Sequence, residues 1–349
     1  MLHRSTEPVL RTENHGSRGS DAASAAGITR NDQRRCRTGS DPSRPPPIKS
    51  AVAGNSWKKW KSALKPFIWL TPALLLLCGL TYLPISLEFI LSFFAADGFA
   101  PPKWIGLENY LTAFHDADFW GALVNNAWYA VWTVTGKLSL SLLVATLLNR
   151  KIRGRALLRS IFFLPVVLSF VAVGIIWTLI YNFDYGIINV SLNTLGLSWL
   201  KGDWLGSPDT AFGAVVLVDL WKWTGFHVVI YLAGLQSIPS DLLEAAALDG
   251  AGPWQRFWRI TFPLLKPFTA INALLATLGS LSVFDLVYVM TQGGPVKATD
   301  VVMIEVYNQA FQFNRLGYAA AMSSIMLVLI VLVSVTLLRS FGRETLQRR

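Results

Sequence analysis

Polar and aromatic side chains recur at regular spacing inside an apolar stretch of the sequence. Asp219, Trp223 and His227 follow one another at intervals of four residues. Because four residues nearly complete a helical turn, a helix would carry all three on one face. A carboxylate and an imidazole can hydrogen-bond to hydroxyl groups, and an indole ring offers a flat apolar surface. The face therefore either lines a path for a polar solute or packs against other helices, for example through an ion pair of Asp219 with Lys222.

Other polar residues also fall inside apolar stretches, where each needs a partner or a water-filled cavity. Lys137 lies near the middle of one such stretch, too far from either end for its ammonium group to reach water by snorkelling. Asn272 and Ser282 lie in another stretch. The candidate pathway residues are Asp219, Trp223, Phe226, His227, Ser280 and Asp285.

Six apolar runs must position these side chains. Each is long enough to cross a bilayer, since about 20 apolar residues suffice. The chain is 52% hydrophobic with only 15% charged residues, which is typical of a membrane protein. The runs cover residues 67–94, 126–148, 160–181, 211–236, 265–291 and 318–338. The sequence therefore predicts an all-α integral membrane protein with six transmembrane helices.

Basic residues predict how these helices are oriented. Lys and Arg concentrate before the first run, in residues 150–159 after the second, and after the sixth, whereas the opposite loops are mixed or acidic. Cytoplasmic loops of membrane proteins carry the excess of positive charge. Both termini and the loop formed by residues 238–267 are therefore expected in the cytoplasm. The same distribution accounts for the net charge of +10 without a nucleic-acid partner.

Residues 1–56 differ in composition from the rest of the chain. They are rich in Arg, Ser, Gly, Asp and Pro and show no apolar periodicity. Such a segment cannot bury enough apolar surface to fold. The sequence thus predicts a disordered basic tail, followed by a six-helix transmembrane domain over residues 57–345.

The loop between the fourth and fifth runs contains residues that typically begin and end helices. Asp241, with Glu244 three residues later, is typical of a capping box at a helix start. Gly250 stands where a helix would close with a left-handed residue, and Pro253 suits the first turn of a second helix. Pro263 should end that helix or begin a kinked one, because it has no N–H to donate. The pattern predicts a helix, a Gly turn and a second helix just outside the membrane.

The same loop resembles the "EAA" loop of ABC importer permeases. The resemblance is carried by Glu244, Ala245, Ala246, Asp249, Gly250, Ala251, Ile260 and Pro263. In that family the loop is the coupling segment that docks into a cleft of a separate cytoplasmic ATPase. The resemblance implies the same role for these residues here.

Further stretches are similar to permeases of carbohydrate ABC importers, including maltose and glycerol-3-phosphate permeases. They are residues 106–110, 162–165, 233–239, 284–285, 291–295 and 317–320. The resemblance covers the chain from about residue 57 onward. It implies an importer of a sugar or sugar-like solute that works by alternating access, with a second permease subunit, two ATPase subunits and an extracytoplasmic solute-binding protein as partners. Sugar sites combine aromatic faces with hydroxyl-binding groups, which makes the Asp219–Trp223–His227 face the best lining candidate.

Motifs for catalysis are missing from the sequence. It contains no G-x-x-x-x-G-K-[ST] loop for ATP, and its four His residues are too scattered to suggest a metal site. No enzyme activity and no cofactor are predicted. The alternative function is a secondary transporter driven by an ion gradient, which predicts internal repeats and broken helices near the midplane. The same ABC architecture carrying glycerol-3-phosphate or another small solute also stays open.

Overall fold

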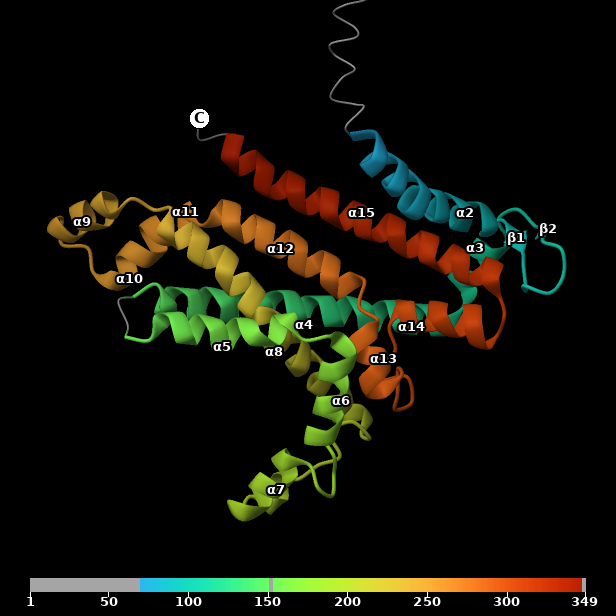
Figure 1. Cartoon of the computed structure of the whole chain (residues 1–349), viewed down its shortest axis with the longest axis horizontal. Helices are drawn as coiled ribbons and strands as arrows, with labels where there is room; N and C mark the ends of the chain where they lie inside the picture. Colours follow the sequence, from blue (N-terminus) through green and yellow to red (C-terminus); the bar gives the residue numbers. More distant parts are fainter. Residues whose placement is uncertain (1–69, 151–152, 347–349) are drawn as a thin grey trace, which may run out of the picture. The chain divides into compact units, whose positions relative to one another are not determined.

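The computed structural model of the chain describes residues 70–150 and 153–346 (Figure 1). The predicted tail, the basic stretch after it and the first three residues of the first predicted span lie outside the described residues. Within these ranges the chain is helical apart from its loops and one short antiparallel pair of strands, β1 (Phe94–Ala95) and β2 (Lys103–Trp104). The predicted all-α class is confirmed for this part of the chain.

Among the described residues, four helices are long and apolar enough to cross a membrane. Two further spans arise when each of two bent helix pairs is counted as one span, which agrees with the six spans predicted. The four helices are Leu70–Leu91, which contains η2 (Cys78–Tyr82) and α2 (Leu83–Leu91), α4 (Ala117–Leu148), α8 (Pro208–Gln236) and Leu316–Phe341 within α15 (Leu316–Leu346). The bent pairs are α5 (Arg155–Val167) with α6 (Phe170–Ile180), and Pro253–Leu264 with α12 (Lys266–Leu281).

The third predicted span is not one continuous helix. Its two halves, α5 and α6, meet at an angle of 101°. Pro165 lies inside the last turn of α5, where it removes a backbone donor and weakens the helix. Leu168 and Ser169 are extended, and the Ser169 hydroxyl accepts a hydrogen bond from the backbone N–H of Ala172 to begin α6. The prediction missed this break because the run was judged by its apolar length, which does not show where a span bends.

The fifth predicted span is also shorter than expected. Helix α12 ends at Leu281, and α13 (Asp285–Thr291) begins after three non-helical residues. Asp285 takes the first position of α13, where its carboxylate is favoured by the positive end of the helix dipole. The prediction of a single helix over residues 265–291 was therefore wrong.

The remaining elements are short and connect the spans. They are α3 (Glu108–His115), α7 (Ile187–Thr194), η3 (Ser198–Leu200), α9 (Ser240–Leu248), α10 (Pro253–Arg256), η4 (Phe257–Thr261), α11 (Phe262–Leu264), α14 (Val302–Tyr307) and η5 (Asn308–Gln312). Figure 1 shows α9, α10 and α11 at the end of the bundle where α4 finishes and α5 begins, with α3 and the strands at the opposite end.

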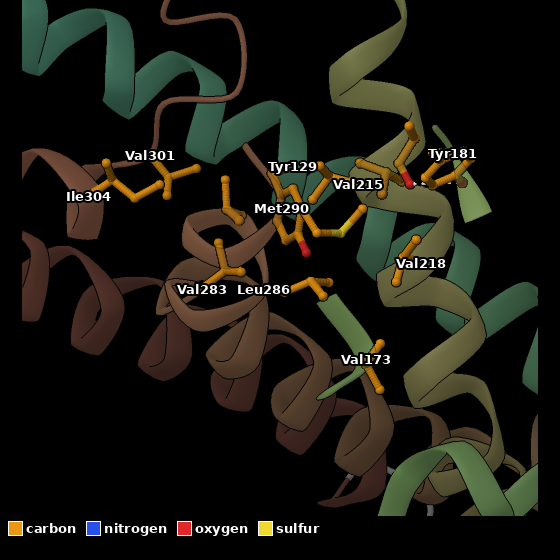
Figure 2. Packing of buried hydrophobic residues seen from close by; sticks show 13 residues of the cluster. Tyr129, Val173, Tyr181, Val215, Val218, Val283, Leu286, Met290, Val301 and Ile304 are labelled. Atoms are coloured by element: carbon orange, nitrogen blue, oxygen red, sulfur yellow. Dashed lines mark hydrogen bonds between the residues drawn. The ribbon is translucent and has the colours of Figure 1, made fainter. Parts of the chain in front are cut away.

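One apolar cluster joins α4, α6, α8, α13 and α14. Figure 2 shows Tyr129, Leu286 and Met290 gathered beside Val215 and Val218 of α8. All five side chains are buried. The cluster fastens the bent half-helix α6 and the separate helix α13 to the straight helices, so the two discontinuous spans are held by packing.

Two of the stretches that resemble sugar permeases meet at the end opposite to α9. The Asn109 amide donates to the carbonyl oxygens of Ser92 and Phe94 at 2.8 and 3.0 Å. Gly317 donates its backbone N–H to the Ala96 carbonyl at 3.2 Å. A Cβ at Gly317 would collide with the Phe94 carbonyl oxygen, so only glycine allows this approach of α15 to the strand.

Candidate functional site

The loop that follows α8 forms the helix, turn and helix that were predicted. Helix α9 ends at Leu248, and Gly250 has a φ of +81°. The backbone N–H of Gly250 donates to the Ala247 carbonyl at 3.1 Å, and that of Ala251 donates to the Ala246 carbonyl at 2.9 Å. These two bonds form a Schellman motif, which requires a left-handed residue at the glycine position. The predicted role of Gly250 in the backbone is confirmed.

The predicted start of α9 was wrong. The helix begins at Ser240 with Pro239 in the capping position, and no side chain caps it. The Ser240 hydroxyl donates instead to the neighbouring Asp241 carboxylate at 3.2 Å. The prediction failed because Pro239 fixes its own φ and starts the helix before Asp241. Pro253, by contrast, opens α10 as expected.

A kink follows Pro263, as the sequence indicated. Helix α10 continues into the π-helical turn η4, which contains Ile260, and then into α11, which contains Pro263. After Leu265 the chain turns by 65° into α12. A proline lacks the N–H for a regular helical bond, and sharp kinks in helices occur at prolines. The kink redirects the chain from the loop into the bundle.

The two ends of the loop are anchored while its middle is exposed. Ile238 and Leu265 pack in an apolar cluster with Tyr231, Leu235 and residues of α4. No residue of α9 is buried. Its exposed residues include Glu244 and Ala245, and the Leu248 side chain is 90% exposed; Asp249, just after the helix, is exposed as well. A helix this short is marginal in water without tertiary packing, so α9 presents a surface suited to a partner.

Inside the bundle, an ion pair joins α4 to α8. Lys137 Nζ lies 2.6 Å from Asp219 Oδ2, and the residues are only 2% and 3% exposed. Lys137 Nζ also lies 3.4 Å from the Ser280 hydroxyl of α12. That hydroxyl is within 2.7 Å of the Thr133 hydroxyl. The pairing of Asp219 with Lys222 that the sequence suggested is therefore corrected to a pairing with Lys137.

Lys222 has a different role. Its ammonium group donates to the backbone carbonyls of Pro165, Val166 and Leu168 at 3.2, 3.4 and 2.6 Å. It also lies over the ring of Phe170 at 4.6 Å. A broken helix leaves carbonyl groups without helical partners, and a cation is favoured at that end of the helix dipole. Lys222 thus satisfies the backbone at the α5–α6 bend.

The other two residues of the predicted face have separate surroundings. His227 is buried, and its Nδ1 lies 2.8 Å from the Asn272 amide oxygen on α12. Trp223 is half-buried between the rings of Phe170 and Phe226, at 5.9 and 5.7 Å. The three residues of this face therefore contact different neighbours. Asp219 contacts α4, His227 contacts α12, and Trp223 packs against aromatic rings.

The six candidate pathway residues divide by burial. Asp219, His227 and Ser280 are buried and have partners within the chain. Trp223 and Phe226 are half-buried, and Asp285 is exposed. Of the six, only Trp223, Phe226 and Asp285 therefore keep accessible side-chain surface in the described part of the chain.

Two buried residues of this polar network, Asn126 and Thr133, were not singled out from the sequence, and a third, Asn272, was noted there but not chosen as a pathway candidate. Asn126 donates to the Ser280 and Leu281 carbonyls at 3.3 Å each, while Thr133 and Asn272 bond to Ser280 and His227. Their common signal is a polar side chain inside an apolar run, where partners are obligatory. Asn126 and Thr133 share a face of α4 with Lys137, which would have identified them.

A loop with several left-handed residues joins α13 to α14. Lys297 forms an exposed ion pair of 2.7 Å with Asp118. Asp300 is only 4% exposed, and its Oδ1 has no hydrogen-bond partner among the described residues. Burial raises the pKa of Asp300 to about 7, the negative charge of Glu305 acts in the same direction, and Lys297 opposes both.

Comparisons with known proteins agree with these features. Residues 137–345 match the family model described as binding-protein-dependent transport system inner membrane component. The chain is 36% identical to the probable ABC transporter permease protein YurN of Bacillus subtilis, over 80% of this chain and 97% of YurN. It is 35% identical to the trehalose/maltose transport system permease protein MalF of Thermococcus litoralis, over 80% of this chain and 95% of MalF.

A further relative is the sulfoquinovosyl glycerol transport system permease protein SmoG of Agrobacterium fabrum, 34% identical over 81% of this chain and 93% of SmoG. Among solved structures, a bacterial ABC transporter involved in the import of the acidic polysaccharide alginate matches with a TM-score of 0.74. That match covers 82% of this chain and 98% of the other at 24% identity, and it confirms the fold. The chain therefore belongs to the family of inner membrane components of binding-protein-dependent transport systems, the permeases of ABC importers.

Proposed function

We propose that the chain is one of two permease subunits of an importer that moves a sugar or sugar-like solute across the cytoplasmic membrane. The observation that carries the proposal is α9, an exposed helix within a loop that is anchored at both ends. Relatives whose names refer to trehalose and maltose or to sulfoquinovosyl glycerol support a carbohydrate-like solute. A related structure titled as a complex with an alginate-bound periplasmic protein supports a solute-binding protein as a partner.

The proposal assigns ATP hydrolysis to separate ATPase subunits. Glu244, Ala245, Ala246, Asp249, Gly250 and Ala251, with Ile260 and Pro263 behind them, form the surface and the lever that couple to an ATPase. The exposed Glu244 would meet a basic group of that partner. The rigid turn at Gly250 and the kink after Pro263 would pass its movement to α12.

The proposed orientation places α9, both termini and the α4–α5 loop in the cytoplasm. Two observations support it. The loop carries Arg150, Arg153 and Arg155, and Figure 1 shows it at the same end as α9 and α10. Positive charge marks the cytoplasmic side of membrane proteins.

A solute pathway is proposed beside Trp223, Phe226 and Asp285. The buried pair Lys137–Asp219 and the His227–Asn272 contact would hold the helices that position these residues. The broken spans of the bundle are also a property of secondary transporters. The family match covers the α5–α6 break and the α12–α13 break, and therefore favours the ABC importer.

A co-purification experiment tests the coupling role. Glu244→Lys reverses the exposed charge of α9, and Gly250→Val disfavours its left-handed turn by about 1 kcal/mol or more. Both variants should insert normally but retain less ATPase and lose solute uptake. Glu108→Lys, which reverses an exposed charge at the opposite end, should retain the ATPase as wild type does. Full uptake with normal ATPase retention in both α9 variants would refute the docking role.

A further inference from the structure

A cavity of about 640 Å³ lies where α4 and α8 end and the α9–η4 segment packs against them. This volume is within the usual range of small-molecule pockets. Its apolar walls come from three parts of the chain and include Leu142, Leu143, Leu235, Trp254 and Phe257. None of the polar contacts described above lies in this cavity.

Two arginines also line the cavity, Arg150 after α4 and Arg256 at the end of α10. In the described ranges, neither forms an ion pair with a carboxylate. The Nε atom of Arg256 is buried without a hydrogen-bond partner in the same ranges. Buried donors in proteins are normally satisfied, so this one indicates an acceptor that the chain does not itself supply. The cavity therefore combines apolar walls with uncompensated positive charge.

The cavity continues an apolar surface at the end of α4. Leu140, Leu143 and Leu147 are exposed there, at spacings of three and four residues that place them on one side of the helix. Leu143 belongs both to this surface and to the cavity wall. Trp254 and Trp258, 73% and 45% exposed, also line the cavity. Tryptophan is enriched where a membrane meets water, which places the arginines at the depth of lipid headgroups.

We propose that this cavity binds an anionic phospholipid. An acyl chain would lie against Leu142 and Leu143, and the phosphate would accept hydrogen bonds from Arg150 and Arg256. The apolar residues of α4 would contact the acyl chain, and the basic residues at its end would contact the phosphate. This is the order in which a phospholipid carries these two groups. A protein partner would have to bring a carboxylate and an apolar segment together at this depth. The inference goes beyond the proposed function and uses the proposed orientation only to name the cytoplasmic leaflet, which is rich in anionic lipids.

A fluorescence experiment on the assembled transporter in nanodiscs tests this site. A bimane probe is attached at Thr146→Cys, inside the cavity wall, in a chain whose Cys36 and Cys78 are replaced by Ser. Phosphatidylglycerol brominated on its acyl chain is compared with brominated phosphatidylcholine at equal mole fraction. We expect stronger quenching by phosphatidylglycerol, and no reversal of it by added inorganic phosphate.

Matched variants separate the cavity from general surface charge. Removing a basic residue that contacts the lipid headgroup should weaken the preference for phosphatidylglycerol at the cavity probe about fivefold, so Arg256→Gln is expected to reduce it by that factor. Arg259→Gln changes an exposed arginine nearby that does not line the cavity, and should keep the full preference. If Arg256→Gln fails to assemble, Arg150→Gln tests the same lipid from another helix.

Three outcomes would overturn the proposal. They are equal quenching by the two brominated lipids, an equal effect of Arg256→Gln and Arg259→Gln, and a probe shielded from both lipids in the assembled transporter but quenched in the isolated permease. The last result would identify the cavity as a protein interface. None of these readouts depends on uptake, so failure here is distinct from failure of the proposed transport function.

Discussion

Lys137 of α4 and Asp219 of α8 face each other inside the bundle, with 2.6 Å between Nζ and Oδ2. Each charge would be costly there alone, because a buried ion without a partner loses its hydration. The Ser280 hydroxyl, 3.4 Å from the same Nζ, brings α12 to the pair. Three helices of the bundle are thus registered against one another by a single charged contact.

Breaking this pair should destabilise the permease strongly. Removing one partner of a buried ion pair costs about 3–5 kcal/mol, so Lys137→Met and Asp219→Leu should each lower the melting temperature of the purified complex on the order of 10 °C. The double variant K137M/D219L removes both charges and should recover much of that loss. Losses that simply add in the double variant would show that the two residues act independently.

The contact of Lys222 with the α5–α6 bend predicts a local effect. Lys222→Met removes a charged donor from three carbonyl groups, and such a hydrogen bond is worth about 1.5–3 kcal/mol. Amides on both sides of the bend should then exchange with solvent about 10- to 100-fold faster, measured by hydrogen exchange and mass spectrometry. Lys103→Met, an exposed substitution at the far end of the bundle, is the control. Unchanged exchange at the bend in Lys222→Met would contradict the assigned contact.

The Asp300 carboxyl predicts a pH dependence of stability. Its pKa is raised to about 7 in the folded chain, mainly by burial, whereas an unfolded aspartate titrates near 3.9. Between these values the folded chain binds more protons, so stability falls as pH rises from about 4 to about 7 and stays low above. The melting temperature should therefore be higher near pH 5 than near pH 8.

Asp300→Asn should flatten this dependence, because an amide stays neutral across the range. The neighbouring charges that act on Asp300 are Glu305, Lys297 and Asp118. Lys297→Met removes the opposing positive charge and should raise the pKa of Asp300 further. An undiminished pH dependence in Asp300→Asn would assign the effect to another group.

The sequence predicted the helical class, the approximate spans and the turn at Gly250 because each depends on local chemistry. Apolar length defines a span, and a left-handed residue after a helix is normally glycine. The break at Ser169 was missed because apolar composition does not reveal where a span bends. Pro165 alone was an ambiguous signal, since prolines are tolerated in transmembrane helices.

The partners of buried polar residues were harder to predict than their positions. Asp219 has Lys222 three residues away in sequence and Lys137 on another helix, and the sequence gives no depth to separate the two. In the structure, Lys222 donates to the carbonyl groups of Pro165 and Leu168 at the α5–α6 bend. Asp219 therefore forms its ion pair with Lys137. The spacing of residues shows which of them share a face of a helix, but it does not show which neighbouring helix contacts that face.

The Asp219–Trp223–His227 face supplies the last prediction, because its members now have different expected roles. His227 is buried against Asn272. His227→Ala would leave that amide oxygen without its partner, at a cost of about 1–3 kcal/mol. The variant should lower permease abundance and melting temperature, while solute preference among the correctly folded molecules stays unchanged.

Trp223→Ala should behave in the opposite way if the pathway lies beside this ring. The side chain is half-buried and contacts Phe170 and Phe226, so its loss removes a surface on which the C–H face of a sugar can pack. Uptake should fall or its solute preference should change, with ATPase retention intact. Trp221→Ala, two residues away on another face of α8, is the matched aromatic control and should leave preference unaltered. Removing an aromatic surface that binds solute must change which solutes are carried. If Trp223→Ala is stable and abundant and transports every tested solute as wild type does, the pathway does not lie beside this ring.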